Sequence, residues 1–334
     1  MMENRHHALG LSDEQVLEMY ETMLLSRKLD ERLWLLNRAG KIPFVVSCQG
    51  QEAAQVGAAF ALNRKEDYVL PYYRDLGVVL AFGMTARDLM LSNFAKAEDP
   101  NSGGRQMPGH FGQKKNRIVT GSSPVTTQIP HAVGIALGAR MAGENIVSFV
   151  TFGEGSSNQG DFHEGINFAS VHKLPVIFMC ENNKYAISVP ISKQVACEKI
   201  SDRAIGYGMP GVTVDGNDPL AVYEVVKEAA DRGRRGEGPT LVETICNRMT
   251  PHSSDDDDRT YKTEEEIVEG KKNDPLISFL AYLKEVGTLD EGTEKVINER
   301  VRVIVDEATD YAEKAPFAEP EHVYKYVYEE DEVR

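Results

Sequence analysis

The sequence lacks the features that would place it in a membrane or an oxidising compartment. It has four cysteines, at positions 48, 180, 197 and 246, and none forms a CxxC pair. This spacing argues against a disulfide framework or a zinc site and favours reduced, mostly buried thiols in a cytoplasmic protein. No run approaches the about 18 apolar residues that a membrane-spanning helix needs. The first ten residues are polar and carry no apolar signal core.

Basic residues are scarce relative to acidic ones. The chain has 37 Lys and Arg against 52 Asp and Glu, which gives a formal net charge of −15. Because such a chain repels a phosphate backbone, nucleic acid is not expected as a partner. The apolar share of 41% is ordinary, and 334 residues suffice for one large α/β domain with helical additions or for two small domains.

The most informative stretch is a strand–helix–strand pattern near the middle of the chain. Residues 145–152 are rich in Val, Ile and Phe, and Gly153–Gly155 form a Gly-Glu-Gly turn. A segment of helical length follows over 161–172, and a second apolar run over 175–180 ends in Glu-Asn-Asn. This pattern indicates a β-α-β unit with parallel strands. Its crossover is nearly always right-handed, so both strands end at the same edge of the sheet.

Glu154 and Asn183 therefore meet at one edge of the predicted sheet. Ligands of open α/β sheets bind at this edge. Carboxylate and amide oxygens suit Mg²⁺, which usually shares its oxygen ligands with substrate phosphates. Gly153 and Gly155 allow the backbone to approach such a ligand closely. The residues alone thus predict a metal and phosphate site of a kind that many protein classes share.

Strand and helix patterns alternate along the rest of the chain. Ser12–Gln15 has the form of a capping box and predicts a long helix, which Gly40 can end as a left-handed cap. Further strands are predicted over 212–214 and 239–246, with a helix over 221–232 between them. Together these elements predict an α/β fold with a mainly parallel sheet and helices on both faces.

We expect three parts along the chain. Residues 1–50 form an N-terminal arm and helix, and residues 51–274 form the α/β domain. Residues 275–334 contain two amphipathic helices and an acidic, tyrosine-rich tail, which are expected to pack on the domain or on a partner. The acidic run Asp255–Asp258 is expected to be a solvated loop or an exposed helix start.

The Gly-Glu-Gly turn followed by Asn182-Asn183 resembles the thiamine diphosphate fingerprint. From about Ser12 to roughly residue 265, and more weakly beyond, the chain resembles the alpha chains of the decarboxylase component of 2-oxo acid dehydrogenase complexes. The resemblance implies the diphosphate-binding module of the thiamine-diphosphate-binding fold, with thiamine diphosphate and Mg²⁺ as cofactors. It also implies oxidative decarboxylation of a 2-oxo acid with acyl transfer to a lipoyl group of the acyltransferase component.

The resemblance assigns roles to individual residues. The implied magnesium ligands are Glu154, Asn183 and the backbone carbonyl of Tyr185. The implied cofactor contacts are Tyr73, Arg74, Ser123, Gly155, His252 and the backbone of Val125. A loop that resembles a monovalent-cation site, with K⁺ as its ion, contains Ser122, Thr127 and Gln128.

Two of these residues also have plain structural interpretations. An arginine after two tyrosines, such as Arg74, is either a surface residue covering aromatic rings or a guanidinium fork for a phosphate. A lone histidine in a polar loop, such as His252, is usually a surface residue. The resemblance favours the functional interpretation of both, and gives His252 a place beside the reacting centre, where it would assist decarboxylation or acyl transfer.

Two local strings resemble the branched-chain type of this enzyme. One is Arg105–Pro108 followed by His110, and the other is the Asp-rich continuation after His252 that ends at Tyr261. They favour a branched-chain 2-oxo acid such as 2-oxoisovalerate as the substrate. The nearest alternative is the same fold acting on pyruvate or acetoin, because only side chains in the pocket separate these enzymes.

A second chain is expected because one catalytic group is missing. Thiamine enzymes need a glutamate against the aminopyrimidine ring, and that residue belongs to a second, related α/β domain for which this chain has no room. The resemblance implies that a beta chain supplies it in an α2β2 heterotetramer. Gly134 and Gly138 lie four apart in a predicted helix, which indicates close contact with another helix of this chain or of a partner.

Two rivals from other classes remain open. Gly153 and Gly155 after a strand, with Glu181 at the end of the next, also suit a dinucleotide-binding oxidoreductase, but Asn158 replaces the third glycine of that motif. A non-catalytic assembly subunit would also lack the glutamate.

Two departures from the thiamine pattern stand out. Glu154 occupies a position where most thiamine enzymes have Asp, and Glu181 occupies one where the mammalian branched-chain enzyme has Arg, so no phosphate contact is expected there.

Overall fold

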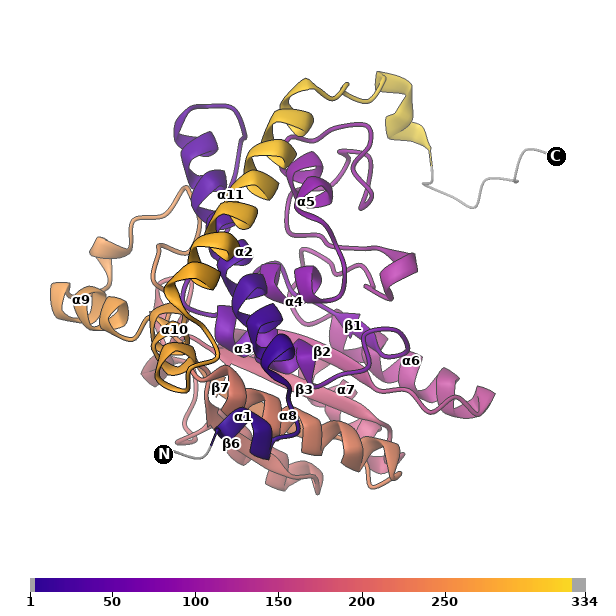
Figure 1. Ribbon diagram of the computed structural model, residues 1–334. Helices are drawn as coiled ribbons and strands as arrows, with labels where there is room; N and C mark the ends of the chain where they lie inside the picture. Colours follow the sequence, from indigo (N-terminus) through magenta and orange to yellow (C-terminus); the bar gives the residue numbers. More distant parts are fainter. Residues whose placement is uncertain (1–3, 326–334) are drawn as a thin grey trace.

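A five-stranded parallel sheet with helices on both faces forms the centre of the molecule (Figure 1). The computed structural model describes residues 4–325, so the end of the predicted tail, 326–334, lies outside the described residues. The sheet confirms the predicted α/β fold. In the order of the sheet, its strands are β1 (Tyr68–Leu70), β2 (Ser148–Gly153), β3 (Val176–Asn182), β7 (Thr240–Ile245) and β6 (Gly211–Asp215). A separate antiparallel hairpin consists of β4 (Tyr185–Ala186) and β5 (Val189–Pro190).

Helices make up most of the remaining ordered structure. They are α1 (Arg5–Ala8), α2 (Asp13–Arg38), α3 (Glu52–Phe60), α4 (Leu76–Ala81), α5 (Ala86–Asn93), α6 (Gln128–Ala142), α7 (Gly160–Val171), α8 (Pro219–Arg234), α9 (Glu264–Lys272), α10 (Pro275–Glu285) and α11 (Glu291–Lys314). Within residues 4–325, none of them combines the length and the apolar character needed to cross a membrane.

The strand residues alternate between two hydrophobic cores. Phe149 and Ile177 face the core shared with α2, α3, α4 and α8, whereas Val150 and Phe178 face the core shared with α6 and α7. This alternation follows from the period of two in a β-strand. Because both faces of the sheet are covered, its central strands contain near-continuous apolar runs, as parallel sheets usually do.

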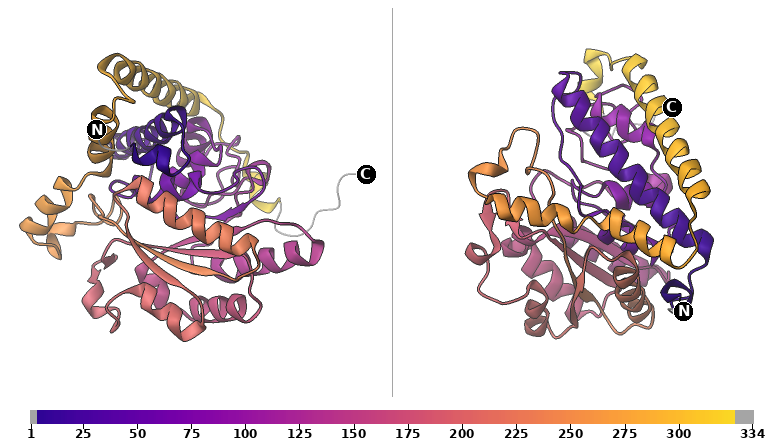
Figure 2. Two further views of the ribbon diagram at one scale, coloured as in Figure 1. Left: turned by 60° about the horizontal axis from the view of Figure 1, so that its bottom comes forward. Right: turned by 60° about the vertical axis from the view of Figure 1, so that its left-hand side comes forward.

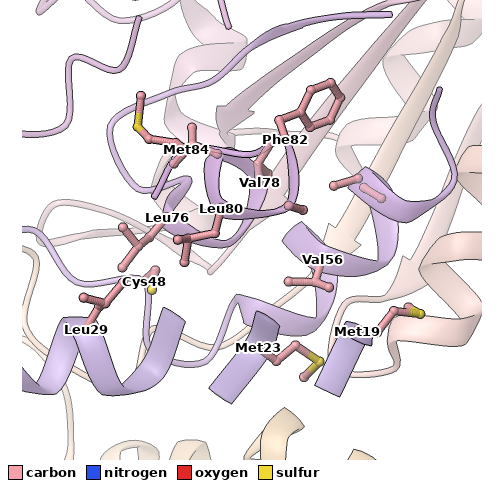
Figure 3. Packing of buried hydrophobic residues seen from close by; sticks show 14 of the residues in the cluster. Met19, Met23, Leu29, Cys48, Val56, Leu76, Val78, Leu80, Phe82 and Met84 are labelled. Carbon is pink, nitrogen blue, oxygen red and sulfur yellow. The ribbon is translucent and has the colours of Figure 1, made fainter. Parts of the chain in front are cut away.

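The long helices α2 and α11 form a layer beside the sheet, where they lie next to each other in both views (Figures 1 and 2). The predicted capping box begins α2, since the Ser12 hydroxyl accepts from the Gln15 N–H and the Gln15 side chain accepts from the Ser12 N–H. Gly40 follows the helix with a φ of +69°, as predicted. In the core below, Met19 and Met23 of α2 lie close to Val56 of α3 (Figure 3).

The predicted β-α-β unit is confirmed, and it determines where the site lies. β2 and β3 pair in parallel with Gly153 opposite Glu181, so the residues that follow both strands lie at one edge. The segments after β1 and β7 reach the same edge because all five strands run in the same direction. Open α/β sheets bind their ligands at the edge where the carboxyl ends of the strands lie.

Candidate active site

Glu154 begins the site at the end of β2, where its side chain is almost fully buried. Its carboxylate Oε1 accepts a hydrogen bond from Nε2 of Gln194 at 3.2 Å. Burial raises the pKa of the Glu154 carboxyl above its ordinary value, which the hydrogen bonds offset only in part. A buried carboxylate with so few donors is stabilised by a bound cation.

Asn183 and Tyr185 lie beside it, where β3 turns into the β4–β5 hairpin. The Asn183 side chain is buried, and its Oδ1 accepts from the Tyr185 N–H at 3.2 Å. The carbonyl oxygen of Tyr185 accepts from Nη1 of Arg248 at 3.3 Å, while Nη2 of the same arginine donates to the Ile187 carbonyl at 2.8 Å. Arg248 therefore holds a turn in which Ile187 has a φ of +57°, an unfavourable value for a β-branched residue.

The two glycines of the Gly-Glu-Gly turn differ in how closely other parts of the chain approach them. A Cβ on Gly155 would lie 2.6 Å from the Cβ of Ala186, whereas a Cβ on Gly153 would meet nothing within 4 Å. The hairpin thus lies directly against Gly155. Three oxygen donors lie next to this turn: the Glu154 carboxylate, the Asn183 amide oxygen and the Tyr185 carbonyl. This set of hard oxygen donors fits Mg²⁺.

Arg74 lies after β1 and is buried, with only 2% of its surface exposed. The interpretation as a surface residue is therefore wrong. Its Nη1 donates to the Ser47 carbonyl, and its Nη2 lies 3.4 Å from Nδ1 and 3.3 Å from the carbonyl oxygen of His252. Its guanidinium carbon lies 5.3 Å from the centre of the Tyr73 ring. Among residues 4–325, Nε of Arg74 has no hydrogen-bond partner, which leaves a buried donor for an anion.

His252 is held in its neutral form. Burial first, and then the positive charges of Arg74 and Arg248, lower the pKa of His252 to about 4. Because Nδ1 accepts from Arg74, the proton of the neutral ring is assigned to Nε2. The His252 N–H donates to Asp256 Oδ2 at 2.7 Å, which fixes the backbone of this loop as well.

A cavity of about 240 Å³ brings most of the predicted cofactor contacts together. The predicted site residues that line it are Tyr73, Ser122, Ser123, Val125, Gln128 and His252. Its apolar walls consist of Phe44, Val46, Pro71, Met107, Pro108 and Val125. Ser156, two positions after Glu154, also lines the cavity, whereas Asn183 and Tyr185 line a separate cavity with Arg248.

Ser123 is oriented by a histidine that the sequence pattern had linked only with the branched-chain type. Nδ1 of His110 lies 2.9 Å from the Met107 carbonyl and so donates to it. Nε2 of His110 then accepts from the Ser123 hydroxyl at 2.8 Å. The Ser123 proton thus points at His110, and the hydroxyl has to turn away from Nε2 to donate to a diphosphate oxygen.

The predicted cation loop is brought together in part. The hydroxyls of Ser122 and Thr127 contact each other, and both donate to the Pro124 carbonyl, at 2.8 and 3.0 Å. The side-chain amide of Gln128 instead donates to the Thr151 carbonyl at 3.0 Å, at the middle of β2. Three oxygens therefore cluster in this loop, while the Gln128 amide is engaged elsewhere.

The acidic run after His252 is partly an ordered network. Nη2 of Arg248 donates to the Tyr261 hydroxyl at 2.8 Å, and that hydroxyl donates to Asp256 Oδ2. Asp258 is buried and pairs with Lys262 at 3.2 Å. Arg248, Asp256 and Tyr261 were not predicted as site residues. The signal that would have found Arg248 is its position, a basic side chain just past the end of a buried strand.

Gly134 and Gly138 are exposed on α6, and a Cβ on either would meet nothing within 4 Å among the described residues. The alternative in which they pack against another helix of this chain is therefore wrong for residues 4–325. The exposed side chains of Phe168 and Val171 on α7, which packs beside α6, extend this surface.

Comparisons with known proteins agree with this geometry. Residues 20–321 match the family model described as dehydrogenase E1 component. The chain is 74% identical over 328 residues to the 2-oxoisovalerate dehydrogenase subunit alpha of Bacillus subtilis, which covers 98% of this chain and 99% of that protein. It is 37% identical to the 3-methyl-2-oxobutanoate dehydrogenase subunit alpha of Mycobacterium tuberculosis, over 98% of this chain and 86% of that protein.

A relative named for pyruvate is less similar than the Bacillus subtilis protein, although its identity exceeds that of the Mycobacterium tuberculosis protein. The pyruvate dehydrogenase E1 component subunit alpha of Staphylococcus aureus is 42% identical over 89% of this chain and 78% of its own length. The dinucleotide-binding alternative is set aside by the family match, which spans the strand ends that form the site. The chain belongs to the family of dehydrogenase E1 components.

Proposed function

We propose that this chain is the alpha subunit of a branched-chain 2-oxo acid dehydrogenase. The family depends on thiamine diphosphate, and an alpha subunit of an E1 component assembles with a beta subunit. The reaction is the oxidative decarboxylation of a branched-chain 2-oxo acid, with transfer of the acyl group to a lipoyl group of an acyltransferase. The three cysteines that are buried and free, Cys48, Cys180 and Cys246, support a reducing, cytoplasmic setting.

The observation that carries the proposal is the cavity of about 240 Å³ that Tyr73, His252 and the apolar walls line. Phe44, Val46 and Met107 in the cavity wall offer apolar surface for an aliphatic side chain. Burial of a methylene contributes about 0.8 kcal/mol. An isopropyl or isobutyl group therefore gains contacts that the methyl group of pyruvate leaves unused.

The proposed cofactor contacts lie after β1, β2 and β3 and in the segment that leads into α6. Thiamine diphosphate, when bound, supplies a stabilised carbanion and an electron sink. Mg²⁺ would be held by Glu154, Asn183 and the Tyr185 carbonyl. The diphosphate would be held by Tyr73, Arg74, Ser123, Gly155 and the backbone of Val125. The hydroxyls of Ser122 and Thr127, with Gln128 beside them, would hold K⁺.

His252 serves the reaction as a neutral donor. Arg74 occupies Nδ1, so Nε2–H is the group that His252 presents to the cavity. An N–H donor stabilises negative charge that develops on a substrate oxygen, and the neutral ring does so as a hydrogen-bond donor. The loop network of Arg248, Tyr261 and Asp256 keeps the ring in place.

The test is a comparison of substrates with the chain and its beta subunit together. The turnover of 2-oxoisovalerate, 4-methyl-2-oxopentanoate and pyruvate is measured with thiamine diphosphate and Mg²⁺ present. We expect kcat/KM for the branched substrates to exceed that for pyruvate by roughly 10- to 200-fold, the range that one or more missing methylenes produce in an apolar pocket. A preference for pyruvate would contradict the branched-chain assignment.

A further inference from the structure

Gln194 lies at the end of the short 3-10 turn that follows the β4–β5 hairpin, outside the set of residues assigned above. Its Nε2 donates to Glu154 Oε1 at 3.2 Å and to the Val189 carbonyl at 2.7 Å. Both partners are acceptors, so the nitrogen of the amide must face them, and the orientation of the side chain is determined. One amide thus joins the hairpin to the carboxylate at the end of β2.

The other end of the same amide has a different environment. Oε1 of Gln194 is buried and has no hydrogen-bond partner among residues 4–325. It lies 3.6 Å from the position that a Cβ on Gly155 would occupy, so it faces the Gly-Glu-Gly turn. Buried polar atoms in native proteins nearly always have a partner, which indicates that a bound water or ligand supplies a donor here.

We propose that Gln194 is a positioning residue that orients Glu154 for Mg²⁺ and anchors the hydration shell of the ion through its unpartnered carbonyl oxygen. This inference rests on the metal site of the proposed function. Mg²⁺ usually keeps several of its waters, and each water has protons to donate. Carboxylate ligands are in turn held by hydrogen bonds from residues behind them, which tune the affinity for the metal.

The Val189 contact extends the effect to a second ligand. Val189 pairs with Ala186 in the hairpin, next to Tyr185, whose carbonyl is assigned to the metal. Gln194 therefore links the carboxylate ligand on one strand end with the segment that carries the carbonyl ligand. Loss of this link lets the two ligands move independently, which weakens the metal site without touching the diphosphate contacts of Arg74.

The experiment measures Mg²⁺ affinity directly. Mg²⁺ is titrated calorimetrically into the complex of this chain with its beta subunit, with thiamine diphosphate in excess. Gln194→Leu and the isosteric Gln194→Met remove both amide contacts, and we expect them to weaken Mg²⁺ binding by about 10- to 100-fold. Turnover at saturating Mg²⁺ should recover. Gln159→Leu is the matched control, because Gln159 is exposed and makes no capping contact to α7.

The Mg²⁺ affinities of the Gln194 and Glu154 variants decide whether Gln194 has this role and whether the metal site exists. Wild-type Mg²⁺ affinity in both Gln194 variants overturns the proposal, and so does a loss of turnover that saturating Mg²⁺ does not restore. Glu154→Ala distinguishes a failure of the metal site from a failure of the role of Gln194 alone. If Glu154→Ala binds Mg²⁺ like the wild type, the metal site itself is wrong. If Glu154→Ala loses Mg²⁺ while the Gln194 variants keep it, only the role of Gln194 fails.

Discussion

Nη2 of Arg74 lies 3.4 Å from Nδ1 of His252 and 3.3 Å from the carbonyl oxygen of the same residue. A permanently charged guanidinium thus faces both the ring and the backbone of the histidine. The contact disfavours the imidazolium and leaves Nε2–H as the only ring donor. It also places the proposed diphosphate contact and the proposed catalytic histidine on one rigid unit.

The first prediction concerns the protonation of His252. Burial, Arg74 and Arg248 lower its pKa to about 4, so the ring should remain neutral when the pH of the cofactor-free complex falls from 7 to 5. The unfolded chain binds this proton near pH 6.5. The contribution of His252 to stability is therefore complete above about pH 6.5 and is lost as the pH falls toward 4. The ring resonances of His252 in an NMR titration give the measurement.

Arg74→Gln provides the comparison. Removal of one positive charge should raise the pKa of His252 toward its ordinary value, because burial and Arg248 then act alone. A wild-type midpoint near 6.5, or a midpoint that Arg74→Gln leaves unchanged, would be incompatible with the proposed electrostatics.

The second prediction uses the two glycines of the Gly-Glu-Gly turn. Gly155→Ala places a Cβ 2.6 Å from that of Ala186 and must displace the hairpin, whereas Gly153→Ala has open space. Overpacking of this kind costs about 1–3 kcal/mol of stability, and we expect Gly155→Ala to weaken cofactor binding while Gly153→Ala leaves it near the wild-type value. Calorimetric titration of thiamine diphosphate measures the change. Equal effects of the two substitutions would show that the contact with Ala186 is not what matters.

The third prediction concerns the loop after His252. Tyr261→Phe removes the hydroxyl that accepts from Arg248 and donates to Asp256. We expect the loop to open more readily, by about 1 kcal/mol or more per lost hydrogen bond. Limited proteolysis and amide hydrogen exchange over residues 252–262 detect this. Tyr311→Phe, which removes a hydroxyl bonded to Glu98 far from the site, is the control and should leave the loop unchanged.

The fourth prediction concerns the surface of α6. Gly138→Leu meets no atom within 4 Å in the described chain, and glycine in a helix costs about 0.5–1 kcal/mol relative to alanine. The substitution should therefore preserve the helix content seen by circular dichroism. It should nevertheless reduce assembly with the other subunits in size-exclusion chromatography, because a bulky side chain separates the facing surface. Normal assembly would mean that this face is free in the complex.

The central β-α-β unit could be predicted because its signals are local. Val, Ile and Phe runs indicate strands, and right-handed crossover places Glu154 and Asn183 at one edge. β1 escaped prediction since its three residues are too few to show a period. The helix α9 escaped for another reason. Its exposed, charged sequence lacks an apolar face, and a capping box at Thr263 with Glu266 begins it instead.

The residues of the candidate site also fall into those that the sequence predicts and those that it does not. Residues at strand ends, such as Glu154 and Asn183, follow from topology, and the resemblance adds Arg74 and His252. Gln194 could not be predicted, because the contacts of its amide depend on the tertiary fold. Arg248 had a single signal, its position just past a buried strand, and its contacts with two backbone carbonyls likewise depend on the tertiary fold. The burial of Arg74 likewise depends on the segment around Ser47, which no local pattern places beside it.

The position of the bound metal ion is the most direct test of the proposed cofactor site. Mn²⁺ accepts the same oxygen octahedron as Mg²⁺ and scatters anomalously. Crystals of the complex of this chain with its beta subunit, grown with thiamine diphosphate and Mn²⁺, would show the ion in an anomalous difference map. We expect a peak bounded by the Glu154 carboxylate, the Asn183 side chain and the Tyr185 carbonyl. A cofactor bound with no peak there, or with the ion held by other residues, would contradict the proposed cofactor site.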